Sequence, residues 1–124
     1  MTTIISTDKA PAAIGPYSQG YVVDKMIFTS GQIAIDPATG EIPEGIEAQT
    51  RQSCKNVGEI LAAAGAGYEN VIKTTCFLSD MANFAAFNVI YEEYFVSKPA
   101  RSCVAVKELP KGVLCEVEAI AVKE

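Results

Sequence analysis

Histidine is absent from this 124-residue sequence, which removes the commonest general base of enzymes. Its absence excludes Ser-His nucleophile systems and mixed Cys/His zinc sites. The four cysteines, Cys54, Cys76, Cys103 and Cys115, are far apart and form no C-x-x-C pair. Such spacing is not typical of a metal or redox site, so we expect free thiols and no metal. Catalysis would have to use carboxylate, arginine, tyrosine, thiol, hydroxyl or backbone groups.

Basic residues and long apolar runs are also scarce. Ten Lys and Arg face fifteen Asp and Glu, which gives a net charge of -5 and an isoelectric point near 4.7. Phosphate binding depends on clustered cations, so this balance argues against a nucleic-acid partner. No stretch is long and apolar enough to span a bilayer, and the first residues lack a basic region followed by an apolar one. We therefore expect no membrane partner and a cytoplasmic location.

What remains is the composition of an ordinary globular domain, with 49% hydrophobic and 20% charged residues. The length suits one hydrophobic core, so residues 1–124 are predicted to form a single domain. Residues 21–35 are rich in β-branched and aromatic side chains, with Asp24-Lys25 as the point of reversal, which predicts a β-hairpin. Loop residues follow at 36–40 and 43–45, where proline and glycine favour turns.

Two helices are predicted from apolar periodicity. In residues 46–64 a stripe recurs at steps of three and four, and Gly65 and Gly67 supply the stop. The stripe consists of Thr50, Cys54, Val57, Leu61 and Ala64. Glu47 precedes Arg51 by four residues, the favourable order for an ion pair along a helix. The second helix carries an aromatic face at residues 84–95 that includes one polar member, Asn88, and it is capped by Ser79-Asp80 or by Asn83.

Residues 71–78, 101–107 and 114–122 are predicted strands, and a turn at 108–112 joins the last two. Together with the hairpin, they indicate an α+β fold in which two helices cover one face of a mostly antiparallel sheet of about six strands. Period two places Arg101 and Cys103 on one face of their strand, and Glu116 and Glu118 on one face of theirs. Arginine and carboxylate could converge in a site, whereas charge placement alone favours a cross-strand ion pair at the sheet surface.

A second polar cluster lies around the hairpin, at Tyr17, Ser30, Gly31 and Gln32. Its glycine can bring main-chain N–H groups close to a ligand, or it can simply form a turn. Cys103 is disfavoured as a nucleophile because no histidine is present to lower the pKa of its thiol, so it is expected to pack or to line a pocket.

Five segments resemble one known family along essentially the whole chain. They are A-P-A-A-I-G-P-Y-S-Q-G at 10–20, F-T-S-G-Q-I at 28–33, N-V-I-K-T-T at 70–75, P-A-R-S-C-V-A-V-K-E-L-P-K-G at 99–112 and C-E-V-E-A-I-A-V at 115–122. On these motifs the sequence resembles the RidA family, also called YjgF/YER057c/UK114. The resemblance implies a chorismate-mutase-like (AroH-type) α+β domain that assembles as a homotrimer with pockets between subunits.

The resemblance also implies a function, the hydrolysis of 2-iminobutanoate and 2-iminopropanoate to 2-oxo acids and ammonia without a cofactor. Arg101 would bind the substrate carboxylate through two hydrogen bonds, and Glu116 would position or activate water. Further pocket contacts are implied at Tyr17, Ser30, Gly31, Asn88 and Cys103. The imines would come from pyridoxal-phosphate enzymes such as threonine or serine dehydratase.

Two other classes of function remain open at this point. One is a non-catalytic trimer that binds 2-oxo acids for regulation, and the other is a chaperone-like holdase or a ribonuclease. The acidic charge and the lack of histidine count against ribonuclease.

Overall fold

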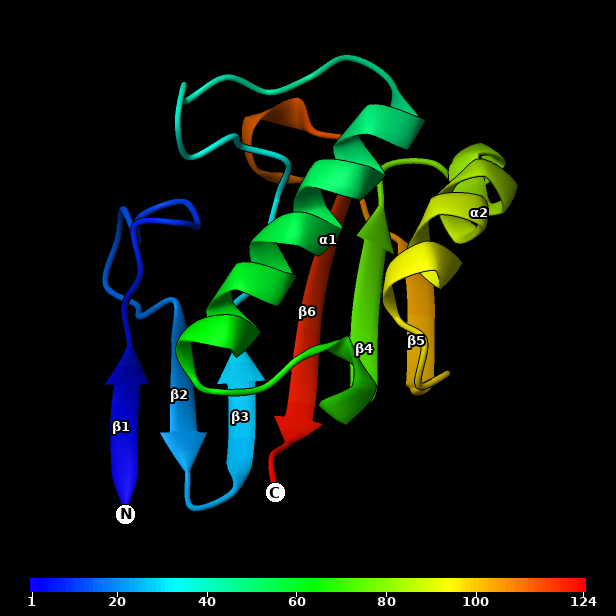
Figure 1. The fold of residues 1–124 in the computed structure, drawn as a ribbon. Coiled ribbons are helices and arrows are strands. Elements are labelled where there is room, and N and C mark those ends of the chain that lie inside the picture. The colour runs from blue at the N-terminus through cyan, green and yellow to red at the C-terminus, as the bar shows by residue number, and fades with distance from the viewer.

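The computed structural model describes residues 1–124 as one six-stranded sheet with two α-helices (Figure 1). The strands are β1 Thr2–Ile5, β2 Gly20–Val23, β3 Met26–Thr29, β4 Val71–Leu78, β5 Ala100–Ala105 and β6 Cys115–Val122. Their spatial order is β1-β2-β3-β6-β4-β5, so β1 and β5 are the two edges. All neighbours pair antiparallel except β4 and β5, which run parallel and are joined through helix α2 (Phe84–Tyr94). The predicted α+β class is confirmed.

The predicted hairpin is present but shorter than expected. Asp24 adopts a left-handed conformation (φ 54°), and the chain reverses there between β2 and β3. The second strand ends at Thr29, so the prediction of strand up to residue 35 is wrong. Beyond it the chain leaves the sheet, and its backbone pairs with β6 again only through a bridge between Gln32 and Val117. Sequence patterns did not locate β1, the sixth strand.

Helix α1 (Ile46–Ala63) confirms the first predicted helix almost to the residue. Four members of the predicted stripe, Thr50, Cys54, Val57 and Leu61, are fully buried against the sheet. Gly65 follows in a left-handed conformation (φ 81°), and its N–H bonds to the carbonyl of Ala62, so the predicted stop is confirmed.

Arg51 does not pair with Glu47 along the helix, as its spacing predicted. Its guanidinium instead reaches across to α2, where it lies 3.0 Å from the Glu93 carboxylate and 3.1 Å from the Tyr94 hydroxyl. The carboxylate on a second helix competes with the local one because α1 and α2 lie side by side. Asp80 is the residue that caps the second helical segment, since its side chain accepts a hydrogen bond from the N–H of Ala82.

Both helices cover the same face of the sheet (Figure 1). On β6 the residues that face the helices are buried, namely Cys115, Val117, Ala119 and Ala121. The opposite face carries no helix, and an apolar row crosses it through directly paired residues, Ile4, Tyr21, Phe28 and Ile120. We call this the open face. Neither helix has the length and apolarity that a membrane crossing requires.

A glycine inside α1 allows the effect of side-chain packing on stability to be compared with that of helix propensity. Gly58 lies where an added methyl group would overlap the ring and hydroxyl of Tyr68, whose hydroxyl donates to the carbonyl of Cys54. Helix propensity alone predicts that Gly58→Ala adds about 1 kcal/mol to stability. We expect a loss of about 1–3 kcal/mol instead, because the aromatic ring must move. Denaturant unfolding checks this, with the exposed change Ala62→Gly as a helix-propensity control; a stabilised Gly58→Ala would contradict the packing.

Candidate active site

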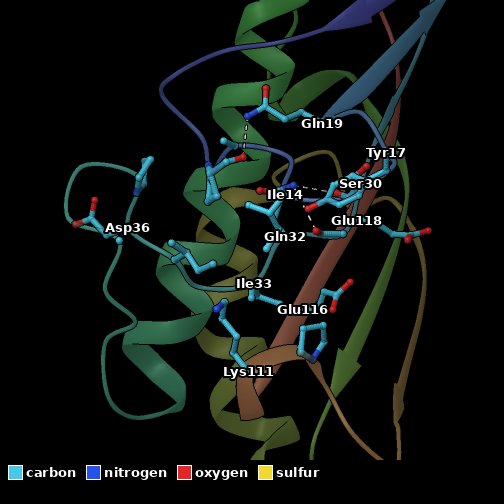
Figure 2. A pocket seen from close by; sticks show the side chains of 17 residues that line it. Ile14, Tyr17, Gln19, Ser30, Gln32, Ile33, Asp36, Lys111, Glu116 and Glu118 are labelled. Atoms are coloured by element: carbon cyan, nitrogen blue, oxygen red, sulfur yellow. Dashed lines mark hydrogen bonds between the residues drawn. The ribbon is translucent and has the colours of Figure 1, made fainter.

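A cleft of about 650 Å³ opens beside the N-terminal half of β6, on the open face of the sheet (Figure 2). One wall is the loop 11–19, and the other is the irregular segment 30–40 that follows β3. The turn at Pro110–Lys111 and the side chains of Glu116 and Glu118 complete it. Its volume suits a small-molecule ligand.

Glu116 is the half-buried acid of this cleft, and Gly31 lies directly against its carboxylate. A methyl group at position 31 would overlap a carboxylate oxygen, so only glycine leaves the space that Glu116 occupies. Burial, and secondarily the neighbouring charge of Glu118, raise the pKa of Glu116 above its ordinary value. A carboxylate of this kind is suited to accepting a proton.

Buried Gln19 holds the first wall of the cleft in place. Its carbonyl accepts a hydrogen bond from the N–H of Thr7 at 2.7 Å, and its amide nitrogen lies 2.8 to 3.2 Å from the carbonyl oxygens of Thr7, Ala10 and Pro11. The backbone of this loop forms no strand, so one side chain satisfies groups that a sheet would otherwise pair. The loop carries Tyr17, which is half-exposed at the mouth of the cleft.

Two amides of α1 hold the second wall and the chain that borders the cleft beside it. Asn56 donates to the carbonyls of Ile33 (3.1 Å) and Ile35 (2.9 Å), while Gln49 accepts from the N–H of Leu114 at 2.8 Å. Gln19, Gln49 and Asn56 were not among the predicted site residues. Only Gln19 lies inside a motif that carries the family resemblance, the segment 10–20, and no periodic pattern marks the other two as buried polar groups.

Arg101 lies on edge strand β5, on the helix-covered face of the sheet. Its Nη1 donates to the Asn88 side chain at 2.8 Å, and its guanidinium carbon lies 4.8 Å from the ring centroid of Tyr91 and 5.4 Å from that of Phe84. This aromatic support restrains the guanidinium plane. Arg101 forms no ion pair, so most of its five N–H donors remain available to an anion.

Arg101 and Glu116 do not face a common cleft within one chain. On β4, Thr74 pairs with Arg101 and Phe77 pairs with Glu116, and directly paired residues share one face of the sheet. Thr74 and Phe77 are three positions apart and point to opposite faces, so Arg101 and Glu116 do as well. The cross-strand ion pair between them is therefore wrong, because the ion pairs of the chain are Met1–Asp24 and Arg51–Glu93. Arg101 and Glu116 also do not converge on one site within a single chain, because they lie on opposite faces of the sheet.

The predicted site residues consequently divide into two groups. The cleft contains Tyr17, Ser30, Gly31 and Glu116. Arg101 and Cys103 lie on the helix-covered side of β5, next to Asn88 of α2, and all three are outside the cleft. One group contains an acid and a glycine, and the other contains a cation.

Cys103 is half-buried beside Cys76, its direct partner on β4. Burial raises the pKa of the Cys103 thiol, and the Arg101 charge lowers it only in part. A thiol held protonated is a poor nucleophile, which agrees with the interpretation of Cys103 as a packed thiol and not a nucleophile. All four cysteines are free thiols. No three side chains of His, Cys, Asp or Glu are grouped to hold a metal ion.

The fold and the site together define a small α+β protein with a ligand-sized cleft and a half-buried acid, and with an arginine that lies on the other face of the sheet. The family model described as Endoribonuclease L-PSP matches residues 7–123. The chain belongs to this family, which is the RidA/YjgF family of the sequence resemblance.

Close relatives extend over nearly the whole chain. The 2-iminobutanoate/2-iminopropanoate deaminase of Escherichia coli K12 is 50% identical and covers 99% of both chains. The mouse protein of the same name is 52% identical over 97% of this chain and 90% of its own. Among solved structures, E. coli TdcF with bound serine is 48% identical, covers 98% of this chain and 99% of its own, and superposes with a TM-score of 0.95.

The loop anchor leads to a stability prediction. Gln19→Ala leaves a backbone N–H and three carbonyls of the first wall without their partner, so the free energy of unfolding should fall by about 1–3 kcal/mol. Gln52→Ala is a matched control, because this half-buried amide donates only to Asn56 and should cost less than about 1 kcal/mol. Denaturant titration measures both, and equal losses would contradict an anchoring role for Gln19.

The raised pKa of Glu116 predicts a pH-dependent stability. The folded protein holds this proton more tightly than the unfolded chain, so the unfolding free energy should fall as pH rises through the titration of Glu116. Glu116→Gln removes that loss. The variant should therefore be more stable than wild type at pH 8, and the difference should shrink toward about pH 4, where both side chains are neutral.

Unfolding at both pH values checks this prediction. Glu118→Gln is the informative companion, because it removes the second cause of the shift and should produce part of the same gain. A stability difference between Glu116→Gln and wild type that is the same at both pH values would contradict the shifted pKa.

Proposed function

We propose that this protein is a 2-iminobutanoate/2-iminopropanoate deaminase, which hydrolyses these imines to the 2-oxo acids and ammonia. The observation that carries the proposal is the half-buried carboxylate of Glu116, with its raised pKa, in a cleft of ligand size. Full-length relatives that bear this name at 50% and 52% identity support it. The relative solved with serine supports a small carboxylate-bearing ligand.

We further propose that the active form is a homotrimer with its pockets between subunits. Arg101 and Glu116 lie on opposite faces of one sheet, so they can serve one substrate only if two chains contribute them. The open face supports assembly, because Tyr21, Phe28 and Val104 remain 37–46% exposed there. Burying these side chains against another chain would be energetically favourable. In this assembly Arg101 of one chain meets the cleft of its neighbour, as in a chorismate-mutase-like trimer.

The residues of the two groups then divide the work of hydrolysis. Arg101 holds the substrate carboxylate with its planar fork, since Asn88 and the aromatic rings fix its orientation. Glu116 takes a proton from water as the water oxygen bonds to the imine carbon. Starting from the protonated imine, Glu116 delivers this proton to the nitrogen, which gives a hydroxyl and an ammonium group on the same carbon. The C–N bond then breaks, ammonia leaves with the bonding electrons, and the hydroxyl returns its proton to Glu116 as the carbonyl forms. Main-chain groups at Gly31 and Cys103, with Tyr17 and Ser30, complete the pocket.

Neither covalent catalysis by cysteine nor cleavage of RNA is part of this proposal. The Cys103 thiol is held protonated by burial, which disfavours attack on the imine. The family description refers to an endoribonuclease, but a net charge of -5 disfavours a phosphate backbone as substrate. We place the reaction in the cytoplasm, where unpaired thiols such as those of this chain stay reduced.

The decisive assay generates 2-iminobutanoate in situ with a threonine dehydratase and follows the release of 2-oxobutanoate with and without this protein. We expect clear acceleration by the wild type. Arg101→Lys keeps the charge and loses the planar fork, so kcat/KM should fall by roughly thirty- to a hundred-and-fiftyfold, which corresponds to about 2–3 kcal/mol. Glu116→Gln should lower kcat more than it raises KM.

Arg51→Lys is the matched control, since Arg51 is the other arginine of the chain and binds Glu93 on the outer helices. It should keep full activity and change stability by less than about 1 kcal/mol. Light scattering on the same samples reports the assembly. Full activity of Arg101→Lys would reject the bidentate anchor, while ligand binding by an intact trimer without acceleration would favour a non-catalytic binding protein.

A further inference from the structure

The charges around the cleft are unfavourable for the substrate that the proposed function assigns to it. Asp36, Glu116 and Glu118 all line the cleft, and Lys111 is the one cation that this chain itself contributes to the lining, beside the Arg101 that the proposed assembly brings from a neighbouring chain. Imino acids and their 2-oxo products carry a carboxylate, so three acidic groups oppose their entry. Over the short distances of a cleft, salt screens such repulsion only in part.

Lys111 occupies a backbone conformation that a lysine rarely adopts. Its φ of 58° and ψ of 16° are left-handed, and it lies between Pro110 and Gly112, which has φ 66°. Glycine and asparagine adopt this conformation at lower cost than a lysine. A long cationic side chain at a strained position is a reason to look for a role of that side chain.

The ammonium of Lys111 is also free to act. It takes part in no ion pair and no side-chain hydrogen bond of the chain. Figure 2 shows the side chain extending from the turn before β6 toward Ile33, along the side of the cleft that holds Glu116. A cation so placed attracts an anion that approaches from solvent.

We propose that Lys111 draws the substrate carboxylate into the cleft and offsets the repulsion of its three acidic groups. The inference rests on the proposed function for the identity of the substrate. Lys111 contributes to capture and binding, whereas Arg101 orients the bound carboxylate. Its contribution therefore appears in KM and in ligand affinity, and it weakens as ionic strength rises.

Lys111→Asn is the sharpest variant, because it removes the charge and at the same time suits the left-handed backbone. We expect its KM for the imine, and its dissociation constant for 2-oxobutanoate measured by calorimetry, to rise about two- to fivefold at low ionic strength. The effect should shrink in high salt, with a smaller change in kcat. The melting temperature should rise by about 3 °C as strain is relieved. Lys111→Arg should bind like wild type.

Lys98→Asn is the matched control, because Lys98 is the other lysine with positive φ (52°) and does not line the cleft. It should show the same thermal gain without a change in KM or affinity. Equal weakening in Lys98→Asn, or unchanged affinity in Lys111→Asn, would overturn the proposal. Calorimetry tests the role of Lys111 independently of the proposed function. If the wild type hydrolyses no imine, the deaminase proposal is rejected. A salt-dependent loss of 2-oxobutanoate binding in Lys111→Asn would still support the role of Lys111 in anion capture.

Discussion

The structure around the cleft depends on one requirement, that backbone polar groups removed from water find hydrogen-bond partners. The loops 6–19 and 30–45 leave the sheet, so apart from the bridge between Gln32 and Val117 no neighbouring strand pairs them. Gln19, Gln49 and Asn56 substitute for those strands and bond the loop backbones one group at a time. No buried side-chain polar atom is left without a partner. The cleft can therefore be open and irregular without being loosely built.

A second constraint is the alternation of side chains along each strand. Register places Arg101 on the face that the helices cover and Glu116 on the open face. The helix side offers aromatic support and a polar partner for a guanidinium, and the open side offers a glycine against which a carboxylate fits. Arg101 and Glu116 thus have separate environments, and within one chain the two side chains do not meet.

Much of the fold was predictable because it is encoded locally. The apolar stripe of α1, the β-branched run of β4 and the alternation in β6 each mark an element within its own residues. The end of β3 at Thr29 was not predictable from the sequence. From Ser30 onward the chain leaves the sheet and forms the second wall of the cleft, whose hydrogen-bond partners lie on α1 and β6. Likewise, the period of two showed which side chains of one strand share a face, but it could not show whether Arg101 and Glu116 share a face. That depends on how β4, which lies between their strands, pairs with each of them.

Helix α2 has a consequence for how this family can diversify. Phe84, Asn88 and Tyr91, all on one stripe of that helix, are the three side chains that hold the Arg101 guanidinium. Replacements along this stripe would retune the tilt and donor geometry of the arginine while its strand stays untouched. Natural selection could in this way adjust the orientation of the guanidinium through Phe84 and Asn88, whereas Tyr91 is constrained because it also belongs to the core and shares a hydrogen bond with Thr74 of β4.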